Sequence, residues 1–199
     1  MVTMNTSDNK WSWLQASNPL IISSSGGGGH ISAAQSLIEQ YQQQEKILAY
    51  HTAQKPSHKP FSSETILEYL MLLPHLPAIR NLIKQGLKIE LPTLSELKQE
   101  YAQLIYQQAK TPYRLYVDFL LDWMPNGYLM TALFNLMQRQ NHGLSLQALV
   151  KKQGMVDEFY KKTIYQQLKQ VLLQAARNGH PYDAIISTQA LGIPAICQA

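Results

Sequence analysis

Hydrophobic and polar positions along the chain predict short strands that alternate with longer helices. The clearest stretch begins with an apolar run at residues 20–22, which lies between Pro19 and a serine cluster. A short apolar run bounded by turn residues is typical of a buried parallel strand. A run of four glycines follows, and from His30 onward small and apolar residues recur at helical spacing. The predicted order is strand, glycine loop, helix.

The same patterns predict the remaining elements. Residues 46–53 and 182–188 have the composition of further strands. The helical spacing of apolar residues predicts helices over these ranges: 94–108, 128–138, 155–178, and a block that begins near Ser63 and is broken at Pro74 and Pro77. We therefore expect an α/β fold: a Rossmann-like parallel sheet with a large helical insertion, formed by residues 19–199 after a polar leader at 1–18.

Residues 111–124 also have helical spacing, and their apolar face allows two interpretations. Their aromatic and apolar side chains are expected to share one face: Tyr113, Tyr116, Leu120, Trp123 and Met124. Such a face is ordinary core, but it could also form a patch that contacts lipid. Asp118 and Asp122 fall on another face, four residues apart, with Arg114 four residues earlier. We interpret these charges as a solvated helix face without catalytic chemistry.

Composition and charge bear on the partners and the cellular compartment to be expected for this protein. The 199 residues carry a formal charge of +4, and 15% of them are charged, with no dense stripe of arginine and lysine among aromatics. Nucleic acid is therefore not an expected partner. A single cysteine, Cys197, suits a reducing compartment. The sequence has neither a signal-peptide pattern nor an apolar run of membrane-spanning length, so we expect a cytoplasmic protein, peripheral at most to the inner face of a membrane.

The glycine loop is the strongest candidate for chemistry. Glycines Gly26, Gly27, Gly28 and Gly29 precede a helix start, where free N–H groups and the helix dipole favour an oxyanion such as phosphate. Ligands of parallel sheets collect at the carboxyl ends of the strands, and His30 would stand there as a proton acceptor. The alternative is a tight turn whose glycines only avoid clashes. A P-loop is excluded because no lysine follows the glycines, and the dinucleotide spacing fails at Ile31.

The residues of this loop resemble a known signature. Ser25, the four glycines, His30 and the small residues Ser32, Ala33 and Ala34 resemble the opening motif of the monogalactosyldiacylglycerol synthase and processive diacylglycerol glycosyltransferase family. That family is related to the N-acetylglucosaminyltransferase that forms lipid II. The stretch from Tyr182 to Thr188 resembles a second strand of the family, with Gln189 at the position where histidine is expected.

The resemblance implies the N-terminal, acceptor-side half of a two-domain GT-B glycosyltransferase. Such an enzyme transfers a hexose from a UDP-sugar to a lipid such as diacylglycerol, without a metal or other cofactor. His30 would be the catalytic base; Ser25, the four glycines, Ser187 and Thr188 would contact the substrate or its phosphates. Tyr116, Leu120, Trp123 and Met124 would contact the membrane. The nucleotide-sugar half is expected on a separate C-terminal domain, and we expect these residues alone to be weak or inactive.

Two other functions remain open from the sequence. The chain could be a non-catalytic module that uses the same scaffold and an apolar patch to bind a membrane or a partner chain. It could also be an unrelated Rossmann-like domain that binds a small phosphorylated ligand. The sugar, the lipid and the oligomeric state are not specified by these residues.

Overall fold

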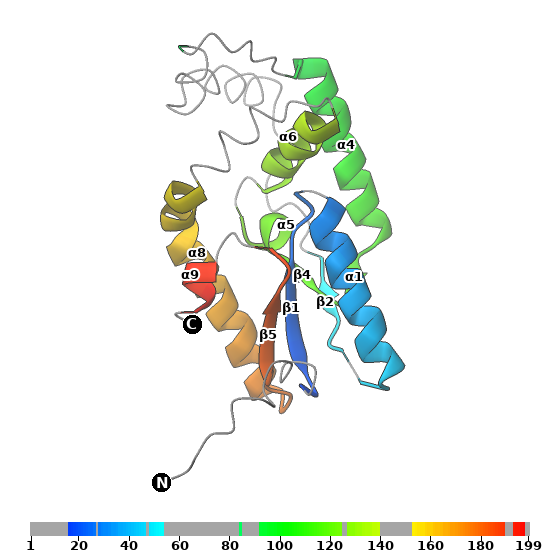
Figure 1. Ribbon diagram of the computed structural model, residues 1–199, viewed down its shortest axis with the longest axis vertical. Coiled ribbons are helices and arrows are strands. Elements are labelled where there is room, and N and C mark those ends of the chain that lie inside the picture. Colours follow the sequence, from blue (N-terminus) through cyan, green and yellow to red (C-terminus); the bar gives the residue numbers. More distant parts are fainter. Residues whose placement is uncertain are drawn as a thin grey trace.

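The computed structural model describes residues 16–26, 28–46, 48–53, 84, 92–124, 127–139, 153–189 and 193–197 (Figure 1). Within these ranges the fold is mixed α/β, with a small parallel sheet and a larger content of helix. The predicted leader, apart from residues 16–18, and the predicted helical block near Ser63, with Pro74 and Pro77, lie outside the described residues.

The parallel sheet is built around strand β1 (Pro19–Ser23). Strands β4 (Val117–Asp118) and β5 (Ala184–Ser187) pair with β1 on its two edges, both parallel, in the order β4-β1-β5. Ile22 is in register with Val117 on one side and with Ser187 on the other. All five residues of β1 are buried, as the uninterrupted apolar run predicts for a central parallel strand. The predicted strand at 182–188 is confirmed as β5.

Helices cover both faces of this sheet. Side chains of β1 alternate between the faces: Ile21 packs with Ala34 and Tyr41 of helix α1 (Gly28–Gln43). Leu20 and Ile22 point to the other face, where they pack with Ile164 and Leu168 of helix α8 (Gln153–Arg177). Figure 1 shows α1 and α8 on opposite sides of β1 and β5, so the sheet lies in the middle of three layers.

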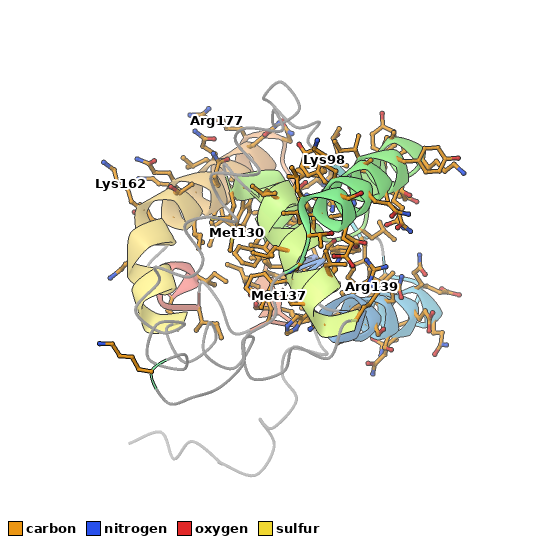
Figure 2. All side chains as sticks on the ribbon, turned by 90° about the horizontal axis from the view of Figure 1, so that it is seen from above. Lys98, Met130, Met137, Arg139, Lys162 and Arg177 are labelled. Atoms are coloured by element: carbon orange, nitrogen blue, oxygen red, sulfur yellow. The ribbon has the colours of Figure 1, made fainter. Side chains whose placement is uncertain are left out.

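A second helical core lies next to the sheet. Helices α4 (Leu94–Lys110) and α6 (Gly127–Arg139) run close together at the upper end of the view in Figure 1, with the short helix α5 (Phe119–Trp123) between them and the strands. Thr93 begins α4 with a capping box, in which its hydroxyl accepts from the N–H of Glu96. Figure 2 shows Met137 directed into this core, whereas Lys98 on α4 points outward. The predicted helices at 94–108, 128–138 and 155–178 are confirmed as α4, α6 and α8.

Two sequence predictions about this region are wrong. Residues 111–124 do not form one helix: they form β3 (Tyr113–Arg114), β4 and the five-residue α5. The predicted strand at 46–53 is reduced to β2 (His51–Thr52), which pairs antiparallel with β3 and forms a separate two-stranded sheet. The chain bends at residues 115 and 116, and Arg114 pairs with both Asp118 and Asp122, so that all three side chains are buried.

The predicted membrane patch is also corrected. Leu120, Trp123 and Met124 are each less than 10% exposed and belong to the core that packs against α8. Tyr116 is half-buried and packs in the core on the α1 side of the sheet. These side chains therefore stabilise the fold instead of offering a surface to lipid. No helix in the described ranges is both long enough and apolar enough to cross a bilayer.

Candidate functional site

The candidate site lies where β1 ends and α1 begins. Ser23, Ser24 and Ser25 are buried, and the chain enters α1 at Gly28. Ser24 Oγ accepts a hydrogen bond from the N–H of Gly26 at 3.1 Å, which closes a tight turn after the strand. The predicted order of strand, glycine loop and helix is therefore confirmed, and the loop follows the carboxyl end of the parallel sheet.

Asp118 holds this loop in place from the neighbouring strand. Its Oδ2 atom accepts hydrogen bonds from the N–H of Ser25 at 2.9 Å and from the Ser25 hydroxyl. Its Oδ1 atom accepts from the N–H of Leu121 at 3.1 Å, so the same carboxylate caps helix α5. One side chain at the end of β4 therefore fixes both the loop after β1 and the helix after β4.

The charges around Asp118 are buried and paired. Nη1 of Arg114 lies 3.5 Å from Oδ2 of Asp118, and its Nη2 atom forms a closer ion pair with Oδ1 of Asp122. Oδ2 of Asp122 also accepts a hydrogen bond from the N–H of Asp118. Burial raises the pKa of the Asp118 carboxyl above its ordinary value, although the hydrogen bonds from Ser25 and the charge of Arg114 oppose that shift. The expectation that Asp118 and Asp122 lie on a solvated helix face is therefore wrong.

His30 lies in the first turn of α1, and Thr188 at the end of β5 fixes its ring. The Nδ1 atom of His30 is 2.8 Å from the main-chain oxygen of Thr188. A carbonyl oxygen only accepts, so Nδ1 must carry the proton in this contact. In the neutral imidazole the other nitrogen, Nε2, then keeps its lone pair and can accept a proton. The half-buried ring is thus oriented through Nδ1, and Nε2 is the nitrogen that carries the lone pair.

Hydroxyl groups also hold the main chain of His30. Its carbonyl oxygen accepts from Ser23 Oγ at 3.0 Å and lies 3.1 Å from Thr188 Oγ1. Thr188 Oγ1 is equally close to Ser23 Oγ, at 3.0 Å, so its single proton serves one of these two acceptors at a time. Ser187 does not join this group, because its hydroxyl donates to the carbonyl of Gln189 at 2.8 Å. Ser187 ends β5 and Thr188 follows it; the structure brings Thr188 to His30, whereas the Ser187 hydroxyl bonds within the turn after the strand.

The glycines of the loop differ in how much space their neighbours leave for a side chain. A Cβ atom on Gly26 would lie 2.9 Å from Leu120 Cδ1 in the core, so a close approach accounts for this glycine. A Cβ atom on Gly28 or Gly29 would meet no atom within 4 Å. Neither has the positive φ that favours glycine, and both lie in the first turn of the helix, where alanine has the higher helix propensity. Packing therefore gives no reason for glycine at these two positions. Gly27 lies outside the described residues.

Two residues of the site were missed from the sequence. Ser23 and Asp118 support His30 and the loop, yet the sequence analysis gave neither a role at the site. The sequence feature that could have indicated Asp118 is its position directly after Val117 and before an apolar run. At such a position a strand can end and an aspartate can cap the next helix. The described residues contain no group of three or more histidine, cysteine, aspartate or glutamate side chains that could hold a metal ion.

Comparisons of the chain with protein-family models, with curated proteins and with solved structures found no match.

Proposed function

We propose that this chain is the acceptor-side half of a GT-B glycosyltransferase that moves a hexose from a UDP-sugar to the hydroxyl of a lipid such as diacylglycerol. The observation that carries the proposal is the His30 imidazole, held through Nδ1 by the Thr188 carbonyl at 2.8 Å beside the carboxyl end of the sheet. The proposal also takes up the resemblance of the loop from Ser25 to Ala34 to the signature of diacylglycerol glycosyltransferases.

In this proposal His30 is the general base. Nε2 takes the proton of the lipid hydroxyl while the hydroxyl oxygen bonds to the anomeric carbon of the sugar. The bond from that carbon to UDP breaks, and UDP leaves with the electron pair, so the anomeric centre is inverted. The Nδ1 contact with Thr188 supports this role because it fixes the tautomer and the direction of the accepting nitrogen.

The unexplained glycines support an anionic group at the start of α1. Main-chain N–H groups in the first turn of a helix have no partner within that helix, and the helix dipole favours negative charge there. Without side chains, Gly28 and Gly29 leave this turn open to close approach. In the proposal these N–H groups face the diphosphate of the donor and stabilise the charge that develops on it as it leaves.

The donor site would be completed by a second domain outside these residues. One wall of a cleft cannot both enclose the sugar nucleotide and align it, and alignment supplies roughly 7–11 kcal/mol of such a barrier. The chain alone is therefore expected to show weak or no transfer. The competing idea of a membrane-binding module loses its main support, because the apolar side chains on which it relied are buried.

The test follows the ring of His30 while acceptor is added. Dioctanoylglycerol titrated into the purified chain should shift the NMR signal of the His30 ring and leave that of the exposed His180 unchanged. Gly29→Ala should weaken binding of UDP without unfolding the chain, because its added methyl group meets open space. An unmoved His30 signal would contradict acceptor binding here. Steady hexose transfer by the isolated chain would contradict the need for a second domain.

A further inference from the structure

A second hollow lies away from the glycine loop. It has a volume of about 460 Å³ and is bordered by strand β2, helix α5, the last turns of α8 and the segment that leads into β5. That segment is anchored beside the start of β1, since the Asn18 side chain donates to the carbonyls of His180 and Pro181. None of the residues that line the cavity belongs to the loop from Ser25 to His30. Its volume lies in the range of sites for small organic ligands.

One part of the lining is apolar. Val117 and Trp123 contribute from the core of the sheet, and Val171 and Ala175 contribute from α8. Trp123 is only 6% exposed, so most of its side chain lies in the core and a small part of it borders the hollow. A ligand that enters would therefore bury part of an apolar surface against these side chains.

The other part of the lining is polar but largely uncharged. Tyr182 OH lies 3.4 Å from His51 Nε2, and the two rings stack with centroids 6.1 Å apart. Burial and the nearby charge of Arg114 lower the pKa of His51 to about 4, so its imidazole is neutral at physiological pH. Gln174 and Asn178 are exposed, lie one turn apart on α8 and complete the polar side.

The charge of the lining disfavours anions. The described residues that line the cavity include no lysine or arginine, and their carboxylate, on Asp122, already pairs with Arg114. A phosphate or carboxylate ligand would lose hydration here, and the basic side chains among the described lining residues are only the imidazoles of His51 and His180. The amides, the neutral imidazole and the hydroxyls of Thr52 and Tyr182 can each both donate and accept hydrogen bonds.

We propose that this cavity binds an uncharged sugar of one or two rings. Sugar hydroxyls also donate and accept, so they match a wall whose groups do both, while the C–H face of a sugar ring can cover the apolar floor. The site is independent of the function proposed above, because it shares no lining residue with the loop of His30.

The test uses Trp123 as a reporter. The chain has three tryptophans, so a W11F/W13F background leaves Trp123 as the single indole. In that background, methyl β-glucopyranoside and methyl β-galactopyranoside are titrated while the indole N–H signal is followed by NMR. We expect a saturable shift for at least one of them, with a dissociation constant on the order of 1–10 mM. Glucose 6-phosphate and uridine should bind more weakly.

Two neighbouring alanines provide matched variants. Ala175 lines the cavity, whereas Ala176 is exposed on the next position of the helix and does not. Ala175→Phe should fill the hollow and weaken the sugar at least about tenfold, and Ala176→Phe should leave binding unchanged. Gln174→Leu, at an exposed position, should weaken binding several-fold without affecting folding and decides the test if Ala175→Phe does not fold. The proposal is overturned if neither sugar binds, if Gln174→Leu binds as tightly as the parent, or if glucose 6-phosphate or uridine binds more tightly.

Discussion

Oδ2 of Asp118 accepts two hydrogen bonds from Ser25, one from its N–H and one from its hydroxyl, across 93 residues of sequence. Ser25 begins the glycine loop and Asp118 ends β4, so this contact joins two neighbouring strands of the sheet at their carboxyl ends. Because Oδ1 of Asp118 also accepts the N–H of Leu121, both oxygens of the carboxylate are acceptors.

Asp118→Asn should therefore destabilise the protein although the shape of the side chain is preserved. Whichever way the amide is turned, its NH₂ group faces either the donors of Ser25 or the N–H of Leu121. We expect a loss of about 2 kcal/mol in the free energy of unfolding, measured by urea denaturation. Glu39→Gln, at an exposed position of α1, is the matched control and should change stability little. Equal stability of the Asp118→Asn variant and the parent would show that this contact does not hold the loop.

Arg114 should be one of the most sensitive positions in the fold. Its guanidinium is buried between Asp118 and Asp122, so Arg114→Met leaves two buried carboxylates without their cation. We expect a loss of about 3–5 kcal/mol in urea denaturation. Arg139 also pairs with a carboxylate, that of Glu100, but its side chain is 56% exposed. Arg139→Met should cost clearly less than Arg114→Met, although the carboxylate of Glu100 is itself buried, and similar losses for both variants would contradict the difference in burial of the two arginines.

His51 should make the free energy of unfolding fall as the pH is lowered. Its pKa is lowered from 6.5 to about 4 in the folded state, first by burial and then by the charge of Arg114. The unfolded chain takes up this proton more readily, so the contribution of neutral His51 is fully present above pH 6.5 and is lost as the pH falls toward 4. From about pH 7.5 to about pH 4.5, urea denaturation should show a loss of roughly 2–3 kcal/mol from this group.

The comparison for this prediction is His51→Gln, which cannot titrate. Its free energy of unfolding should change less over the same pH range, and the difference between the two curves isolates His51. Parallel curves for the variant and the parent would mean that His51 is protonated equally in both states.

Glycines at two helix starts should respond in opposite ways to alanine. A Cβ atom on Gly127 would lie 1.6 Å from the main-chain oxygen of Leu120, so Gly127→Ala requires the backbone to move. We expect a loss of roughly 3 kcal/mol or more. Gly29→Ala meets open space and should increase stability by up to about 1 kcal/mol. Thermal and urea unfolding of both variants test this, and a destabilised Gly29→Ala would reveal a packing role for that glycine.

Elements defined by local spacing could be predicted from the sequence. The apolar run of β1 and the periodic faces of α4 and α8 require only their own residues, and each was placed within a few positions. At the site, Gly29 and His30 were expected at the carboxyl edge of the sheet, and Thr188 was expected at the same edge. The distance of 2.8 Å between His30 and Thr188 confirms that placement, whereas their chemical roles remain predictions.

The parts of the fold and of the site that could not be predicted depend on contacts that the spacing of residues does not indicate. The spacing of apolar residues from Tyr113 to Met124 resembles that of a helix, although the segment forms two short strands, a bend at residues 115 and 116, and a five-residue helix. In this segment the buried charge of Arg114 is paired with two carboxylates, and the spacing of apolar residues gives no sign of such pairing. The same limit concealed Asp118: its partner at the loop lies 93 residues earlier.

The position of β1 has a consequence for synthesis. Its partners on β5 are made some 165 residues later, so a buried and largely apolar segment leaves the ribosome long before this neighbour exists. Closing so long a loop is slow compared with forming the local helices, which can appear while translation continues. β1 and β5 can therefore pair only after Ser187 has been made, and until then one edge of β1 lacks its strand partner.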